Sequence, residues 1–465
     1  MKFLISAILL LSGTPGFCRQ VTATVISGQV DAANAQTVYS LVPGDTLVIP
    51  STATAYLHLG NIVGTAAGHI TVINSGRIVT AGAFSYFELT GTLQYVDFIF
   101  TDVATSYGMY INNASYRAMT CVNATIQDCK FKGIEIRNPA DYAIYFNHNR
   151  TYDGTAASLN KNISFDHFKI TKCGATTPVQ LGFSGGNYMD SVTINDFTID
   201  SVNSGVVFQM EWVFHTKIYN CSITNTGLTA FAHSAVFFVR GDADIRNNFI
   251  YNFWGNGYRA FGISLVPSKG SPMGVCSFTN NVVINSRKYG AVEVNTQPGD
   301  TGSSYIRPVN YYIQNNTVGQ LNAADYYNTS GSAGGGGAAF DIYFAIGFCR
   351  IWNNIYFNCY RDKGQGIGGV NYLWHDGNFT STPDTANNLY STDGIALLTD
   401  TITGAVRFPS LAVVPGGVTI PAIATDKAGV ARSAPYTVGA FQYFTPFVPV
   451  TTLQTVIRGK RIINQ

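Results

Sequence analysis

The chain has 465 residues, of which 46% are hydrophobic and only 12% are charged, against a charged share of about 25% in typical soluble domains. Its 28 basic and 26 acidic residues leave a net charge of +2, so bulk charge gives no support to a nucleic-acid partner or to an anionic membrane surface. Length alone would favour about two to three domains, but repeat architectures escape that rule because each repeat packs only on its neighbours. One elongated body is therefore allowed.

The N-terminus has the pattern of a secretory signal. A basic residue precedes the apolar run 3–11, and small or turn-forming residues follow at 12–16. The run is shorter than the roughly 20 residues that span a bilayer, and no later segment qualifies. We therefore expect residues 1–20 to be a signal peptide and the mature protein to be secreted, extracellular or periplasmic, with no membrane span. Cys18 would permit lipid attachment, but Phe17 before it is not the small residue that attachment requires.

The seven other cysteines form no CxxC or Cys/His metal pattern. Several stand beside the asparagines of the repeat described next, which favours small thiols buried in a core. A disulfide between Cys121 and Cys129 is the alternative.

A six-residue signature, apolar-x-Asn-Asn-x-apolar, returns along the middle of the chain with a period of about 24 to 39 residues, in the range of solenoids. Copies of it lie at 126–131, 165–170, 194–199, 218–223, 245–250, 278–283, 313–318 and 351–356. Each copy predicts two short strands joined by a bend, because Asn and Asp tolerate the left-handed backbone region and bond their own backbone.

The bend positions of successive copies should stack as a ladder of side chains along the axis, as amides do in other stacked parallel sheets. These positions are Asp128, His167, Asp196, Asn220, Asn247, Asn280, Asn315 and Asn353. The flanking Ile, Val and Phe residues should point inward and fill the core.

Further strands are expected after the signatures, at 205–213, 228–239, 259–266, 290–295 and 338–346. Alternation places Val292 and Val294 on one side and Glu293 on the other. No stretch shows sustained helical periodicity with caps.

The sequence thus predicts an all-β fold, a single-stranded right-handed parallel β-helix (solenoid) over residues 21–443, followed by a C-terminal tail at 444–465 that caps its end. A β-propeller or sandwich is the alternative. Long side loops are expected at 139–161, 266–275, 296–309 and 322–337, and these should wall a cleft.

Three segments resemble secreted proteins of the pectin-lyase-like superfamily. Residues 41–50, with Pro43-Gly44-Asp45-Thr46, look like its PGDTI opening segment, and 64–72 is similar to a rung of the chondroitinase B and alginate lyase group. Residues 429–441 resemble the closing segment of many such bacterial proteins.

The resemblance implies the parallel β-helix but not an activity, because the superfamily includes lyases, glycoside hydrolases and non-enzymatic binding proteins. In the chondroitinase B and alginate lyase group a Lys and an Arg act as base and acid, and calcium often neutralises the uronate carboxylate. The local Lys and Arg motifs of that group are not matched, and neither are the motifs of polygalacturonase-type hydrolases.

The candidate site is centred on residues 209–288. A uronate lyase needs a cation, a base and an acid in reach of the sugar, whereas a hydrolase needs two carboxyl groups about 5 to 9.5 Å apart. The catalytic candidates are Glu211, His233, Arg259, Lys288 and Glu293. The substrate-binding candidates are Gln209, Trp212, Arg240, Trp254 and Tyr258, whose rings would either stack on sugars or pack in the core.

Calcium remains an open cofactor, because Asp196 with Asp200, or Asp242 with Asp244, would offer oxygen ligands. Their spacing fits no calcium loop, so no metal ligand is assigned.

Together these features predict an exported, monomeric, carbohydrate-active β-helix that binds an extended, uronate-containing polysaccharide and, if catalytic, cleaves it as a lyase or glycoside hydrolase. The alternative is a non-catalytic cell-surface or extracellular scaffold or adhesion protein. That alternative draws on the scarcity of glutamate, which occurs at only four positions.

Overall fold

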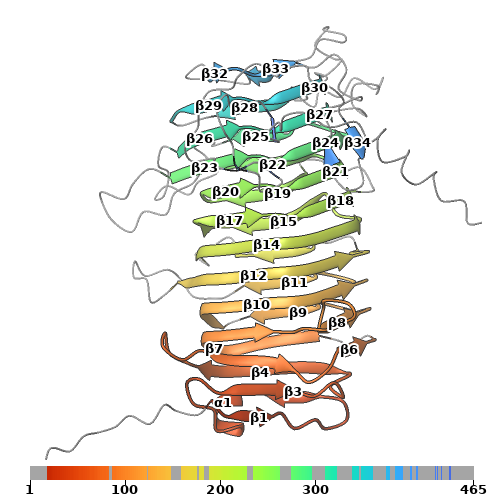
Figure 1. Ribbon diagram of the computed structural model, residues 1–465, viewed down its shortest axis with the longest axis vertical. Coiled ribbons are helices and arrows are strands. Elements are labelled where there is room, and N and C mark those ends of the chain that lie inside the picture. Colours follow the sequence, from red (N-terminus) through yellow and green to blue (C-terminus); the bar gives the residue numbers. More distant parts are fainter. Residues whose placement is uncertain are drawn as a thin grey trace, which may run out of the picture.

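The structure is a computed structural model. The residues that it describes are 18–82, 86–122, 124–147, 159–174, 177–182, 188–227, 234–261, 274–295, 309–321, 338–344, 347–359, 373–376, 383–390, 398–400, 405–406, 425, 427, 431, 439 and 440. Within this part of the chain, 33 strands join in one continuous parallel ladder. The parallel β-helix and the all-β class are therefore confirmed, and the rungs stack from β1 to β33 along the long axis (Figure 1).

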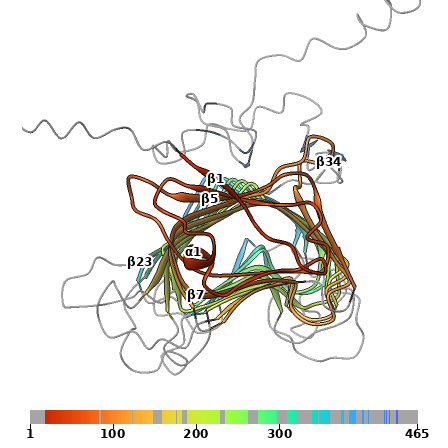
Figure 2. The ribbon, with the colours of Figure 1, turned by 90° about the horizontal axis from the view of Figure 1, so that it is seen from below.

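The ladder folds around the axis as three faces, which enclose the core when the molecule is viewed along that axis (Figure 2). Face I contains β1 (Gln20–Thr22), β3 (Thr46–Ile49), β5 (Ile70–Asn74), β16 (Val213–Phe214), β17 (Thr216–Tyr219), β20 (Ala243–Arg246), β23 (Gly274–Thr279), β26 (Val309–Gln314), β29 (Cys349–Trp352) and β32 (Asp384–Ala386). Face II contains β6 (Ile78–Ala81), β8 (Met109–Asn112), β18 (Ser222–Thr226), β21 (Phe249–Phe253), β24 (Val282–Ser286), β27 (Thr317–Leu321), β30 (Ile355–Cys359) and β33 (Leu389–Tyr390).

Face III carries the candidate site. It contains β2 (Val30–Ala32), β4 (Tyr56–Val63), β9 (Met119–Val122), β11 (Ile144–Asn147), β13 (Val179–Leu181), β15 (Val206–Glu211), β19 (Ala235–Arg240), β22 (Asn256–Ala260), β25 (Val292–Asn295), β28 (Phe340–Phe344) and β31 (Trp374–Asp376). Five strands turn a corner without ending. They are β4 and β7 (Tyr86–Ile99), from face III to face I, and β10 (Thr125–Arg137), β12 (Asn160–Thr171) and β14 (Met189–Val202), from face I to face II.

Inward side chains of the three faces form one continuous core along the axis. Phenylalanines stack from rung to rung within it: the ring centroids of Phe98 and Phe131 are 5.0 Å apart and those of Phe131 and Phe165 are 5.4 Å apart. Such a fully buried side chain contributes about 1.5–3 kcal/mol to stability. The predicted placement of Val292 and Val294 on one side of their strand is confirmed, because both belong to this core.

The bends of the signature form the corner between faces I and II. His167, Asp196, Asn220, Asn247, Asn280, Asn315 and Asn353 all take the left-handed backbone region, with φ between 55° and 60°. Asp128 was wrongly aligned with them, because register places it beside Asn162 at the corner between faces III and I. Register instead places Gly133 in the stack, beside His167. A glycine is required at this position because a Cβ would collide with the carbonyl oxygen of Phe100.

The buried ladder of amides is made by the second asparagine of the signature, not by the first as predicted. Asn248 donates from Nδ2 to Oδ1 of Asn281 over 3.0 Å, and Asn281 and Asn316 repeat the contact to the next rung. Each Nδ2 also donates to a carbonyl of the preceding rung, as from Asn248 to Ile218 over 3.1 Å. The first asparagine of each pair provides the bend, and the second joins the rungs.

The cysteines that the structure describes are free thiols, and all but Cys18 are buried. Cys121 and Cys129 therefore form no disulfide, and burial raises the pKa of Cys129 to about 12. These thiols are small core residues, as the repeat pattern favours.

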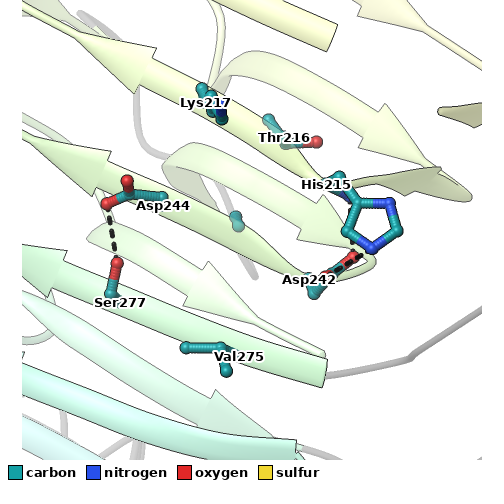
Figure 3. Close-up of a pocket in the computed structure, with 8 residues that line it drawn as sticks. His215, Thr216, Lys217, Asp242, Asp244, Val275 and Ser277 are labelled. Atoms are coloured by element: carbon teal, nitrogen blue, oxygen red, sulfur yellow. Dashed lines mark hydrogen bonds and ion pairs between the residues drawn. The ribbon is translucent and has the colours of Figure 1, made fainter. Parts of the chain in front are cut away.

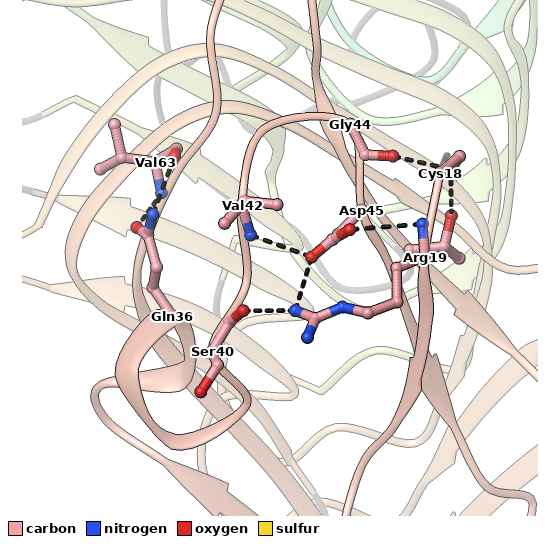
Figure 4. A network of polar contacts seen from close by, with 9 residues as sticks. Cys18, Arg19, Gln36, Ser40, Val42, Gly44, Asp45 and Val63 are labelled. Atoms are coloured by element: carbon pink, nitrogen blue, oxygen red, sulfur yellow. Dashed lines mark hydrogen bonds and ion pairs between the residues drawn. The ribbon is translucent and has the colours of Figure 1, made fainter. Parts of the chain in front are cut away.

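Asp45 of the opening segment ties the first strand to the first turns (Figure 4). Its side chain is 2% exposed and accepts hydrogen bonds from Arg19 Nη2 at 2.8 Å and from the Val42 amide at 3.0 Å. Beside it, α1 (Ala35–Val38) presents Gln36, whose side chain donates to the carbonyl of Val63 and accepts from its amide. These contacts close the N-terminal end of the core.

The expected signal peptide falls almost wholly on residues 1–17, and the tail 444–465 and all or most of the side loops expected at 266–275, 296–309 and 322–337 likewise lie outside the described residues. The loop expected at 139–161 is wrong over 144–147, where β11 forms, and residues 148–158 lie outside the described residues. Among the residues described, no helix is long and apolar enough to cross a membrane.

Candidate functional site

One row of side chains points outward along the whole length of face III, because it alternates with core residues on every strand. Register sets its members in line: Asp31, His58, Glu88, Thr120, Tyr145, Gln180, Gln209, Phe238, Arg259, Glu293 and Asp341. We call this the outer row. The predicted residues Gln209, Arg259 and Glu293 belong to it, and Glu211 and Arg240 lie two positions further along their strands.

These five residues form what we call the arginine–glutamate cluster, defined as Gln209, Glu211, Arg240, Arg259 and Glu293. Arg240 Nη1 lies 3.3 Å from Glu211 Oε2, and Gln209 Nε2 donates to Glu211 Oε1 over 2.7 Å. Arg259 Nε lies 2.8 Å from Glu293 Oε1. Strand register alone thus brings together five of the ten residues predicted from the sequence.

Two phenylalanines lie between the paired charges. The Arg240 guanidinium carbon is 5.8 Å from the ring centroid of Phe238 and 5.4 Å from that of Phe261. The guanidinium carbon of Arg259 lies 5.9 Å and 5.0 Å from the same two rings. The two cations therefore share one aromatic support, which adds a favourable cation–π term to each ion pair.

Asparagines complete the hydrogen bonding of Glu293. Asn256 donates to its Oε2 at 2.6 Å and Asn295 to its Oε1 at 3.0 Å. The Glu293 and Arg259 side chains are only 10% and 13% exposed, and loss of one partner of such a pair costs about 3–5 kcal/mol. Glu293 therefore accepts three hydrogen bonds within the protein, out of about four that a carboxylate can accept, and is poorly placed to accept a proton from a substrate.

Glu211 and Glu293 cannot act together as the two carboxyl groups of a glycoside hydrolase. Register places them three strand steps apart, on β15 and β25, with β19 and β22 between. At the strand spacing of parallel sheets this is roughly 14 Å, beyond the upper limit of about 9.5 Å for such a pair.

The remaining predicted residues lie elsewhere. Tyr258 is 1% exposed and its ring stacks on Phe278 in the core, so the expected sugar contact is wrong. Trp212, 8% exposed, packs in a separate apolar cluster at the corner between faces III and I, which also removes it as a sugar platform.

Trp254 and Lys288 lie at the opposite corner of face III, before β22 and β25. The Arg287 guanidinium carbon is 5.5 Å from the Trp254 ring, and Lys288 Nζ is 4.9 Å from the ring of Tyr289. Neither belongs to the arginine–glutamate cluster. His233 lies outside the residues that the structure describes.

A second candidate site, which the sequence analysis missed, lies on face I just past the corner (Figure 3). It is a cavity of about 260 Å³ lined by His215, Thr216, Lys217, Asp242, Ala243, Asp244, Val275 and Ser277. We call it the His215 pocket. Asp242 and Asp244 entered the sequence analysis as candidate calcium ligands, and no spacing along the chain points to His215, because the pocket brings together residues of different turns.

His215 is held between two carboxylates from neighbouring rungs. Its Nδ1 lies 2.6 Å from Asp190 Oδ1 and its Nε2 lies 3.7 Å from Asp242 Oδ2, while its backbone amide donates to Asp242 Oδ1 over 2.8 Å. The hydrogen bond to Asp190 raises the pKa of His215 to about 9. Burial raises the pKa of Asp242. The pocket therefore holds a protonated imidazole beside a carboxyl group that takes up a proton more readily than usual.

The acids considered for calcium are engaged by hydrogen-bond donors. Asp200 accepts from Thr224 at 2.6 Å and from Asn225 at 2.7 Å, and Asp244 accepts from Ser277 at 2.7 Å. No group of three or more His, Cys, Asp or Glu side chains is placed for a metal among the described residues.

Neither a protein-family model nor a curated protein matches the sequence. Solved structures that are similar include an alginate lyase from Paenibacillus sp. str. FPU-7, with a TM-score of 0.40 and 16% identity over 64% of this chain and 95% of that one. The family 6 alginate lyase AlyGC has a TM-score of 0.37 and 12% identity, and the match covers 80% of this chain but about half of that enzyme, 51%. A mannuronic acid-specific family 6 lyase from human gut microbiota has a TM-score of 0.29 and 11% identity over 79% of this chain and 92% of that one.

Proposed function

We propose that the protein binds an extended, uronate-containing polysaccharide along the outer row of face III. The observation that carries the proposal is the pair of arginines on adjacent strands, Arg240 and Arg259, which share the rings of Phe238 and Phe261. Carbohydrate sites combine apolar rings with a few fixed polar groups in this way.

Arg240 has hydrogen-bonding capacity left for a ligand. Its ion pair with Glu211 uses Nη1, its side chain is 23% exposed, and its Nη2 makes no hydrogen bond with a described residue. A guanidinium carries five N–H donors in a planar fork that fits a carboxylate. Gln209, a partly buried residue on the preceding strand, would face the hydroxyl groups of a neighbouring sugar.

The test compares Arg240→Gln with the matched variant Arg350→Gln. Arg350 is a similarly half-buried arginine on face I, paired with Asp384 at 3.1 Å and 3.9 Å from the Trp352 ring centroid. Affinity for a panel of uronate polymers is measured by calorimetry or affinity electrophoresis. Loss of a charge-assisted hydrogen bond should weaken binding by Arg240→Gln about 10- to 100-fold, while Arg350→Gln binds as the wild type does. Absence of wild-type binding across the panel, or equal losses in the two variants, would refute the proposal.

We also propose that the protein is exported, on the strength of the signal pattern in residues 1–20. Export would bring it to polysaccharides outside the cytoplasm. Expression of the full chain followed by N-terminal sequencing of the protein in the medium or periplasm checks this, and retention of Met1 on the recovered protein would contradict it.

Cleavage of the polymer is a second candidate function, favoured by the His215 pocket. Elimination beside a uronate needs a proton acceptor and a proton donor, and the imidazolium of His215 next to the carboxyl of Asp242 offers such a pair. Unsaturated products would indicate a lyase, whereas new reducing ends without unsaturated products would indicate a hydrolase. His215→Asn should abolish the cleavage in both cases. No product across the panel would leave a non-catalytic scaffold or adhesion protein.

A further inference from the structure

Arg117 stands apart from the other partly buried arginines of the described chain, because its guanidinium rests on aromatic rings and makes no hydrogen bond with a described residue. Its central carbon is 3.5 Å from the ring centroid of Tyr145, 4.5 Å from that of Tyr116 and 5.7 Å from that of Tyr142. The single ion-pair contact, from Nε to Asp141, is long at 3.8 Å. We call these residues, Tyr116, Arg117, Tyr142 and Tyr145, the tyrosine–arginine group.

The position of this group is fixed by the register of face III. Tyr145 is a member of the outer row, and Gln180 and Gln209 follow it on the next two strands before Phe238. Tyr145 and Phe238 are thus three strand steps apart, roughly 14 Å along the axis. The group and the arginine–glutamate cluster therefore lie on one line, joined by two glutamines.

The chemistry of the group suits an acidic sugar. The Arg117 side chain is 17% exposed, so the charge is partly withdrawn from water while its donors remain unused. Tyr116 is 58% exposed and offers a ring face together with a phenolic hydroxyl. An apolar ring, a cation and hydroxyl groups at one place are what a uronate residue, with its apolar ring face and its carboxylate, can engage.

We propose that the tyrosine–arginine group is a second saccharide subsite, which binds a uronate unit of the same polysaccharide chain several units away from the arginine–glutamate cluster. The inference rests on the proposed function, because the occupant is the polymer proposed there. It adds a second contact point for that polymer and a minimum chain length for full affinity.

The test measures affinity against chain length. Wild type, Tyr116→Ala and Arg117→Gln are titrated with a uronate disaccharide and with the long polymer of the same uronate. Both variants should bind the long polymer about tenfold more weakly and bind the disaccharide as the wild type does. The control is Tyr390→Ala, an exposed tyrosine of face II that pairs with Tyr356, and its binding should be unchanged.

The outcomes separate the two proposals. Failure of the wild type to bind any uronate polymer overturns both. If the wild type binds and Arg240→Gln weakens that binding, but Tyr116→Ala and Arg117→Gln match the wild type on the long polymer, the second subsite alone is overturned. Tyr116 projects from the surface, so its removal should leave the fold intact, and a circular dichroism spectrum equal to that of the wild type verifies this.

Discussion

His215 joins two neighbouring rungs through its charge. The hydrogen bond to Asp190 raises its pKa from 6.5 to about 9, so the folded protein binds the imidazole proton more tightly than the unfolded chain does. The stabilisation is therefore complete below about pH 6.5 and is lost as the pH rises through about 9.

We expect His215→Asn to lower the free energy of unfolding relative to the wild type near pH 6, and the difference to shrink by about pH 10. Urea unfolding across that range measures it. Ser277→Ala serves as the control, because it removes a hydroxyl from the same pocket without removing a titrating group, and its effect should not change through this range. A His215→Asn difference that stays constant with pH would contradict the assignment.

At the residue scale, the sequence could predict which side chains point outward only where it showed which residues of the strand alternate toward the core. Glu293 was placed correctly opposite Val292 and Val294, because the alternation of that segment is visible in the sequence. Tyr258 was misplaced because its strand was expected from Arg259 onward, whereas β22 begins at Asn256, and the outward direction of Arg259 turns Tyr258 into the core.

At the scale of the element, the buried amide of each signature is the part that joins rungs. Asn316 is fully buried, donates from Nδ2 to the carbonyl of Phe278 over 2.8 Å, and accepts at Oδ1 from the amide of Asn281 over 2.9 Å. Asn316→Ala leaves both groups without partners inside the core, which costs about 1–3 kcal/mol for each.

The expected loss for Asn316→Ala is therefore about 2–5 kcal/mol, measured by urea unfolding. Asn220→Ala is the matched control, because Asn220 is exposed and makes one side-chain contact, to Asn195; its cost should be about 1–2 kcal/mol. Equal costs for the two variants would remove the special role of the second asparagine.

The signature predicted both the bend and the presence of a ladder, because asparagine is suited to each. It could not show which asparagine does which, since the two are adjacent and identical in type. Only the backbone decides: the first takes positive φ, as at Asn315 with φ of 57°, and this turns the second inward.

For the whole molecule, the terminal rung is the weakest because it has a neighbour on one side only. Asp45 holds β1 through its contact with Arg19. Burial alone would raise the pKa of Asp45, but the hydrogen bonds from Val42 and Arg19 keep this pKa below its ordinary value. In the full chain, expressed in the cytoplasm so that Arg19 is retained, we expect Asp45→Ala to loosen β1 and to accelerate cleavage by trypsin after Arg19, while cleavage after Arg246, an interior position, keeps its wild-type rate. Mass spectrometry of timed digests checks this; an unchanged rate at Arg19 would show that other contacts hold the strand.

The overall architecture was predictable because a repeated signature in one orientation leaves few alternatives to a parallel stack. The His215 pocket was not, because Asp190, His215 and Asp242 belong to three successive turns and meet only through the stacking offset at one corner. The spacing of the repeated signature gives the number of turns of the β-helix. It does not show which outward-pointing residues of neighbouring turns lie next to one another.

The amide ladder also gives the rod a polarity. From Asn248 to Asn354 every side-chain amide donates both to the amide oxygen of the later turn and to a backbone carbonyl of the earlier one, and its own oxygen accepts from the earlier turn. Each join between these turns is therefore chemically the same. A turn carrying the Asn-Asn pair is thus a module with matching ends, and the molecule could be lengthened or shortened by whole turns within 245–388 while every junction retained its partners.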